Sequence, residues 1–183
     1  MNTNTDALTS ITAALQNDGV AVVRTDTIYG IIALASSRVA VEKVYTVKRR
    51  NPAKQCIVLV TKPEDVPVYA QYIKQYSLDS ELPTSVVVPA SDEPEWLLRG
   101  GDAIAYRVVR DPFLRRVVET VGPVIAPSAN PEGEPPARTI EEAERYFGRL
   151  VDAYIDGGEV PETVQASQII QVQADGTVRS IRS

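Results

Sequence analysis

Polar side chains follow a short apolar stretch near the start of the chain, where Val20–Val23 gives way to Thr25, Asp26, Thr27 and Tyr29. The apolar stretch predicts a buried strand. Hydrogen-bonding side chains and an aromatic ring at a strand end are typical of a ligand-site wall, because function often lies on loops held by a rigid scaffold. The alternative is an ordinary turn in which Asp26 caps local amides. Spacing alone leaves both interpretations open.

A basic cluster lies where a predicted helix ends, with Lys48, Arg49, Arg50 and Lys54 just before the apolar stretch Cys56–Val60. Cations at a helix C-terminus complement its negative dipole end, so a solvated helix end is one interpretation. The other is a polyanion site. A lysine supplies a point charge and an arginine a planar fork, and together they could hold one phosphate chain.

Two further stretches combine an apolar strand pattern with polar groups. Arg107 interrupts the apolar stretch 103–109, so it lies either on an open sheet face or beside an anion in a cleft. Ser128 and Asn130 follow the apolar residues 124–126, which places small hydrogen-bonding groups at another strand end.

The composition excludes several kinds of chemistry. The chain has no histidine and one cysteine, Cys56, which removes Ser-His and Cys-His pairs and makes a zinc site improbable. Any catalysis must therefore use carboxylates, cations, hydroxyls and the substrates' own groups, which favours positioning and charge neutralisation, as in reactions at phosphates. The net charge of −5 argues against broad nucleic-acid binding.

Helical and strand patterns alternate along the 183 residues, which predicts a single α/β domain, residues 1–183, on a mixed sheet. No apolar segment is long enough to span a bilayer and no signal peptide is visible, so we expect a soluble, cytoplasmic protein. The expected helices are 6–17, 38–48, 111–121 and 139–150, and the polar stretch 61–81 is also expected to be helical in character. The expected strands are 20–23, 31–35, 56–60, 85–89, 103–109 and 124–126, with a final hairpin of 167–173 and 177–181.

In order and spacing, five elements resemble the threonylcarbamoyl-AMP synthase family, whose domain is called YrdC-like. They are TDTIYG at Thr25–Gly30, Lys48-x-Arg50, Arg107, Ser128-x-Asn130 and Ser167. The resemblance implies a twisted mixed sheet flanked by helices, with a large concave cavity. It also implies a nucleotidyltransferase that joins L-threonine, bicarbonate or CO2, and ATP into threonylcarbamoyl-AMP and pyrophosphate, for the t6A modification of tRNA.

The same resemblance implies roles for particular residues. The catalytic and nucleotide-binding set is Lys48, Arg50, Ser128 and Asn130, joined near the phosphates by Ser167 and Arg182. The threonine-binding set is Thr27, Tyr29 and Arg107. Both nucleophiles would belong to the substrates, which agrees with the missing histidine. Mg2+ would arrive with ATP and be held mainly through phosphates, without a protein metal site. The implied partner is a downstream threonylcarbamoyl transferase complex, with weak direct contact to tRNA.

Several positions depart from the pattern of this family. Arg24 and Asn51 stand where proline is usual, Pro127 replaces a threonine, Glu132 replaces a serine, and residues 82–85 alter a further motif. These changes support an alternative function, a non-catalytic or altered-chemistry YrdC-like protein that binds nucleotide or RNA.

Overall fold

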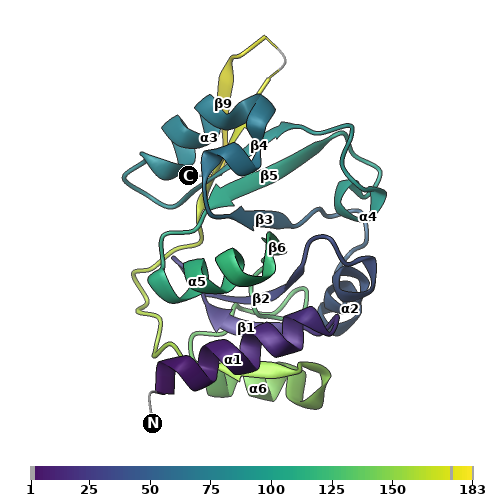
Figure 1. The fold of residues 1–183 in the computed structure, drawn as a ribbon, viewed down its shortest axis with the longest axis vertical. Coiled ribbons are helices and arrows are strands. Elements are labelled where there is room, and N and C mark those ends of the chain that lie inside the picture. Colours follow the sequence, from purple (N-terminus) through teal and green to yellow (C-terminus); the bar gives the residue numbers. More distant parts are fainter. Residues whose placement is uncertain (1–2, 174, 183) are drawn as a thin grey trace.

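The computed structural model describes residues 3–173 and 175–182, and Figure 1 shows their helices packed around one sheet. Among these residues the strand order is β7-β1-β2-β6-β3-β5-β4-β8-β9, with parallel pairs β7/β1, β3/β5 and β4/β8 and antiparallel pairs elsewhere. The predicted mixed α/β sheet flanked by helices is therefore confirmed. The strands are β1 (Ala21–Arg24), β2 (Tyr29–Leu34), β3 (Ile57–Val60), β4 (Thr84–Pro89), β5 (Ala103–Val108), β6 (Val124–Ile125), β7 (Ala153–Ile155), β8 (Gln168–Val172) and β9 (Val178–Arg182).

Helices cover both faces of this sheet. The α-helices are α1 (Thr3–Gln16), α2 (Arg38–Lys48), α3 (Ala70–Ile73), α4 (Glu95–Leu98), α5 (Pro112–Val121) and α6 (Ile140–Phe147). On one face α1 packs beside α5, and Ile11, Leu15, Leu114 and Val117 fill the space between these helices and the sheet (Figure 1). None of the helices in the described ranges is both long and apolar enough to cross a lipid bilayer.

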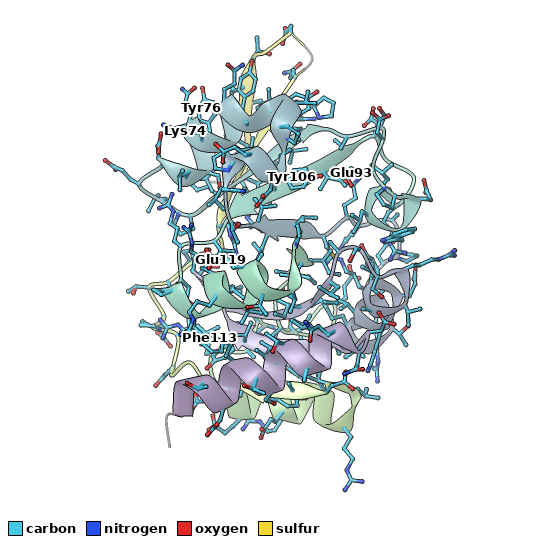
Figure 2. All side chains as sticks on the ribbon, in the orientation of Figure 1. Lys74, Tyr76, Glu93, Tyr106, Phe113 and Glu119 are labelled. Carbon is cyan, nitrogen blue, oxygen red and sulfur yellow. The ribbon has the colours of Figure 1, made fainter. Side chains whose placement is uncertain are left out.

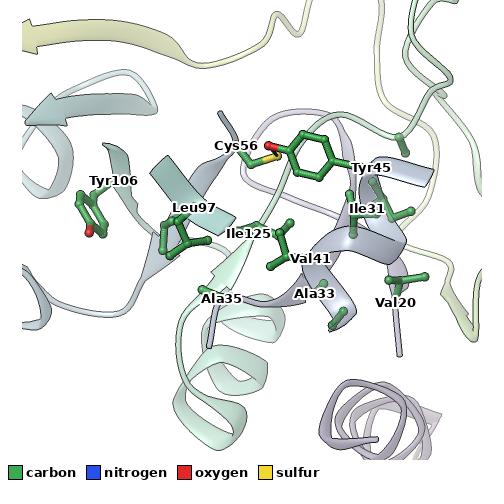
Figure 3. Close-up of a cluster of buried hydrophobic side chains, with 14 of the residues drawn as sticks. Val20, Ile31, Ala33, Ala35, Val41, Tyr45, Cys56, Leu97, Tyr106 and Ile125 are labelled. Atoms are coloured by element: carbon green, nitrogen blue, oxygen red, sulfur yellow. Dashed lines mark hydrogen bonds between the residues drawn. The ribbon is translucent and has the colours of Figure 1, made fainter. Parts of the chain in front are cut away.

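The opposite face holds the larger apolar core, which contains residues of α2, α3, α4 and α6. Figure 3 shows Val41 of α2 beside Ile31 and Ile125 of the sheet, with the Cys56 thiol next to the Tyr45 hydroxyl. Because side chains alternate along a strand, consecutive residues of β1 and β2 contribute to different clusters. Each central strand is therefore buried on both faces, which explains its nearly continuous apolar sequence.

The turn between β1 and β2 is shorter than the sequence indicates. Tyr29 pairs with Arg24, so β2 begins two residues before the predicted strand at residue 31. The Thr25 amide and hydroxyl both donate to the Ile28 carbonyl oxygen, at 3.1 and 2.7 Å, which closes a tight turn over residues 25–28. Tyr29 is thus a fully buried strand residue, and only the residues before it form the turn.

The segment 61–81 is less regular than the predicted helical stretch. It contains the 3-10 helices η1 (Pro63–Asp65) and η2 (Pro67–Tyr69), then α3, then the π-helical turn η3 (Lys74–Leu78). Pro63 and Pro67 each begin a new short helix, because proline is accommodated at the first helical position but interrupts a longer helix.

The final two strands form the predicted hairpin. The Gln173 amide donates to the Thr177 carbonyl oxygen at 2.8 Å across the turn, where Gly176 has φ 82°. Arg182 of β9 lies opposite Ile169 of β8, which returns the last described residue toward the middle of the molecule. The hairpin thereby contributes Ile169 and Arg182 to one wall of a cavity.

Candidate active site

A cavity of about 290 Å³ lies between the β1–β2 turn, the loop after β6 and the β8–β9 hairpin. Among the described residues, most of the side chains predicted for the site line it: Thr27, Tyr29, Arg50, Arg107, Ser128, Ser167 and Arg182. Lys48 and Asn130 do not line it, although both contact Ser128. The sheet order therefore brings together polar stretches that are far apart in the sequence.

The cavity carries positive charge. Three guanidinium groups, those of Arg50, Arg107 and Arg182, line it, and no carboxylate side chain of the described residues does. Hydroxyls of Thr25, Thr27, Ser128 and Ser167 supply further hydrogen-bonding groups on the same walls. Guanidinium groups bind phosphates and carboxylates through paired N–H donors, and nearby hydroxyls can add further hydrogen bonds to the same anion.

Arg107 lies at the floor of the cavity on β5. Its neighbour Tyr106 faces the opposite side of the sheet and donates to Glu93 at 2.7 Å (Figure 2), so strand alternation places Arg107 on the cavity side. Arg107 Nε lies 3.4 Å from Asp26 Oδ2, and the two side chains are only 5% and 4% exposed. Burial lowers the pKa of Arg107, and the Asp26 carboxylate opposes that shift.

Arg50 is held firmly at the second wall. Its Nε donates to the Lys54 carbonyl oxygen at 3.2 Å and its Nη2 to that of Gln55 at 2.7 Å. The guanidinium also lies 5.9 Å from the centre of the Tyr45 ring, whose hydroxyl donates to the same Lys54 oxygen. Because its position is fixed by two carbonyls and a ring, Arg50 can present its charge without first ordering its side chain.

Lys48 is almost fully buried at the end of α2. Its ammonium donates to the carbonyl oxygens of Ser128 and Asn130 and lies 3.4 Å from Asn130 Oδ1. Burial, and to a smaller extent neighbouring Arg50, lower the pKa of Lys48 to about 8. In this structure Lys48 holds the loop after β6, and direct contact between its ammonium and a phosphate remains a prediction.

The loop after β6 is built around Ser128 and Asn130. Ser128 Oγ donates to Asn130 Oδ1 at 2.6 Å, and Asn130 Nδ2 donates to the Glu134 carbonyl oxygen at 2.7 Å. The Ala129 amide bonds the Tyr29 carbonyl oxygen, and Gly30 forms a β-bridge to Ser128. These bonds place the Ser128 hydroxyl on the cavity wall and leave Asn130 as the brace behind it.

The threonine-side residues are Thr27 and Tyr29. Thr27 Oγ1 lies 3.2 Å from Thr25 Oγ1 inside the turn. The Tyr29 hydroxyl donates to the Gly158 carbonyl oxygen and accepts from the Gly157 amide, each at 2.9 Å, and burial raises its pKa. Tyr29 therefore lines the cavity with its ring while its hydroxyl holds the segment that leads from β7 to β8.

The remaining wall joins Ser167 to Arg182. Arg182 Nε and Nη2 donate to the Ser167 carbonyl oxygen at 2.9 and 2.7 Å, and Ser167 Oγ lies 3.1 Å from Ser85 Oγ. Both predicted residues thus lie at the cavity, with the Arg182 guanidinium partly engaged by the backbone.

Two positions that depart from the family pattern contact each other. The Glu132 carboxylate accepts from the Asn51 backbone amide and from the Lys54 ammonium. A proline at position 51 has no amide hydrogen, so this contact requires a residue other than proline at this position. Lys54 and Asn51 lower the pKa of Glu132, and the added negative charge is neutralised beside the basic cluster.

Arg24 and Pro127 have different surroundings. Arg24 Nη1 donates to the carbonyl oxygens of Gly157 and Glu159, at 3.0 and 3.4 Å. It therefore fixes the same segment that Tyr29 holds. Pro127 keeps its structural role through its carbonyl oxygen, which accepts from the Ile31 amide at 2.9 Å.

Sequence reasoning missed part of this site. No spacing rule indicates that the ring of Tyr45 lies against Arg50. Cys56 belongs to the apolar stretch Cys56–Val60, which by itself indicates only a strand. It is buried with a raised pKa and contacts the Tyr45 hydroxyl, but it also borders the cavity.

The fold and the cavity together define an α/β protein with a candidate anion site, which is lined by residues of loops and strands of a mixed sheet. Residues 13–183 match the Sua5/YciO/YrdC family, described as "Telomere recombination", and the chain belongs to this family.

Several relatives are named threonylcarbamoyl-AMP synthase. The protein of Coxiella burnetii is 28% identical over 164 residues, which cover 86% of this chain and 88% of the relative. The protein of Hahella chejuensis is 32% identical over 152 residues, covering 79% and 83%. The crystal structure of P. abyssi Sua5 complexed with L-threonine matches 96% of this chain with a TM-score of 0.83 at 21% identity, and it shows the shared fold. The match covers 53% of that chain, so the present protein spans about half its length.

Proposed function

We propose that this protein is a threonylcarbamoyl-AMP synthase, a nucleotidyltransferase. The observation that carries the proposal is the cavity lined by Arg50, Arg107 and Arg182 together with small hydroxyls, without an acidic side chain from the described residues. Each proposed substrate would carry an anionic group at neutral pH: the phosphates of ATP, bicarbonate itself and the carboxylate of L-threonine. The relatives of this name are similar over most of their length, which supports the same assignment.

The proposed reaction uses nucleophiles that the substrates bring. The neutral amine of threonine attacks CO2 and loses a proton to give a carbamate, and with bicarbonate the same carbamate forms with loss of water. A carbamate oxygen then attacks the α-phosphorus of ATP, the bond to the β-phosphate oxygen breaks, and pyrophosphate leaves with the electron pair. The protein has to align these groups and neutralise charge, which requires no histidine.

Each wall of the cavity has a proposed ligand. Arg107, Thr27 and the Tyr29 ring would hold threonine, with Arg107 paired to its carboxylate. Arg50 would face the phosphates, and Ser128 would hydrogen-bond the nucleotide or the carbamate. The other members of the nucleotide set are Lys48, Asn130, Ser167 and Arg182.

Mg2+ would be bound with the nucleotide. In the part of the chain that the structure describes, no three metal-ligating side chains lie together. The ion would therefore be held by phosphate oxygens and water, as Mg2+ commonly is. When bound it neutralises phosphate charge, while the cavity residues supply the orientation.

The proposal extends to the fate of the product. An adenylate of this kind is consumed by a transferase acting on tRNA, so a downstream threonylcarbamoyl transferase complex is the proposed partner. Direct tRNA contact would be weak for a chain with net charge −5. Because tRNA is modified where it is made and used, the proposed location is the cytoplasm.

Pyrophosphate release tests this function. We expect purified protein to release pyrophosphate only when ATP, L-threonine and bicarbonate are all present, and Arg50→Met to reduce the rate by about 100-fold or more. Arg115→Met is the matched control, since Arg115 is exposed on α5 and pairs with Glu119 on the same helix. ATP binding without pyrophosphate release would favour the non-catalytic nucleotide- or RNA-binding alternative.

A further inference from the structure

Asp26 is the one charged residue of the TDTIYG stretch, and the proposed chemistry leaves it without a role. Its side chain is 4% exposed, although aspartate is rarely so buried without a purpose. Its Oδ1 accepts from the backbone amides of Arg110 and Asp111, at 2.8 and 2.6 Å. These amides lie directly before α5, whose first turn can be found by the Phe113 label in Figure 2. One carboxylate oxygen thus fixes Asp26 to the end of β5.

The second carboxylate oxygen is directed at Arg107. Asp26 Oδ2 and Arg107 Nε are 3.4 Å apart, and neither buried atom has a hydrogen-bond partner among the described residues. A buried pair of opposite charges without a direct hydrogen bond is poorly compensated for the loss of water. It is retained most readily where the charge on one partner is needed for a ligand.

The geometry of a guanidinium explains what such a pair can do. Nε occupies one edge of the planar group, and a carboxylate at that edge leaves the two terminal nitrogens as a fork for a second anion. Arg107 lines the cavity, so this fork is on the cavity side. Asp26 is itself anchored to the backbone, which prevents the pair from rotating as a unit.

We propose that Asp26 is a positioning residue that fixes the orientation of Arg107 for the carboxylate of the amino-acid substrate. The inference rests on the proposed function for the identity of that substrate. Asp26 touches no substrate itself, and it acts by keeping Arg107 aligned before threonine enters. Its loss should therefore weaken threonine binding and leave ATP binding nearly unchanged.

Asp26→Asn separates this role from simple support of the fold. Asparagine keeps a carbonyl oxygen for the amides of Arg110 and Asp111 and replaces the oxygen facing Arg107 with an amide group. We expect the KM for threonine to rise at least about tenfold, while the KM for ATP changes by less than about twofold. A structural defect alone would alter both constants or lower the amount of folded protein.

Asp111→Asn is the matched control. Asp111 caps α5 by accepting from the Leu114 amide at 2.8 Å, and asparagine caps helices equally well. Like Asp26→Asn, this variant removes one carboxylate charge near the start of α5. Unlike Asp26, Asp111 forms no ion pair with Arg107 among the described residues. We expect its threonine KM to match that of the parent protein.

A crystal structure of the Asp26→Asn protein makes the test independent of the assigned reaction. Displacement of the Arg107 guanidinium from its position on the cavity floor would support the inference. An unchanged Arg107, an unchanged KM for threonine, or an equal effect of Asp111→Asn would overturn it. Failure of the parent protein to bind threonine or release pyrophosphate would instead contradict the proposed function, and the position of Arg107 would still decide the role of Asp26.

Discussion

The buried ammonium of Lys48 is the most unusual ionic group at the residue scale. Burial lowers its pKa to about 8 from an ordinary value of 10.5. The other charged or titratable groups that act on it are Arg50, Cys56 and Glu132. A lysine in this position carries a cost of burial whenever it is protonated.

Because of this cost, the free energy of unfolding is expected to rise with pH. Between pH 8 and 10.5 the unfolded chain keeps the Lys48 proton that the native protein has released, so raising the pH through this range favours the native state. Relative to Lys48→Met, the free energy of unfolding of the parent should rise by up to about 3 kcal/mol across the range. Urea unfolding of both proteins at a series of pH values measures the difference. Groups common to both proteins cancel in the difference, so a flat difference would show that Lys48 keeps its ordinary pKa and a falling difference that burial does not lower it.

Residue types were predictable from the sequence, but the partners of those residues were not. The sequence is compatible with Arg107 on an open sheet face or beside an anion in a cleft. The structure places Arg107 on a cavity wall beside Asp26. Asp26 was considered as a cap for local amides. It caps two amides more than 80 residues away, because the end of β5 lies beside the turn. Contacts of this kind depend on strand order, which spacing along the chain does not reveal.

At the scale of elements, the loop after β6 and the loop after α2 act as a unit. The Glu132 amide donates to the Lys48 carbonyl oxygen at 2.8 Å, and the Glu132 carboxylate returns to Asn51 and Lys54. Both loops carry residues of the candidate site. Asn51 in one loop and Glu132 in the other, both departures from the family pattern, form one contact and are therefore expected to depend on each other.

A double-mutant cycle measures this dependence. Asn51→Pro removes the backbone N–H that donates to the Glu132 carboxylate, and Glu132→Ser removes that carboxylate. Each change alone should therefore lower Tm by a few degrees. The double variant should lower Tm by less than the sum, since the contact can be lost only once. The Tm of each variant is measured by monitoring thermal unfolding with circular dichroism. Strict additivity of the two changes would mean that the pairing contributes nothing to stability.

Element types were predicted better than element limits. The apolar stretches gave the central strands and the final hairpin, because burial on both sides requires uninterrupted apolar residues. The start of β2 was missed, since pairing between Tyr29 and Arg24 extends the strand through a polar stretch. The sequence predicts helical character across 61–81, whereas the prolines of this segment divide it into short helices.

At the scale of the whole molecule, the order of strands in the sheet creates the site. β3 lies between β6 and β5, and β8 lies beside β4, so loops from both halves of the sequence meet around one cavity. The sequence motifs named most of the lining residues through their resemblance to a known family. The arrangement that makes the cavity basic appears only when the sheet is assembled.

The proposed function requires that threonine, bicarbonate and ATP react together in this cavity to form threonylcarbamoyl-AMP. Isotopically labelled bicarbonate tests it most directly, with the nucleotide products identified by mass spectrometry immediately after mixing. We expect labelled threonylcarbamoyl-AMP to form only when threonine and ATP are present, to be lost in Arg50→Met and to be kept in Arg115→Met. Pyrophosphate release without label in any nucleotide, or no nucleotide product at all, would contradict the account.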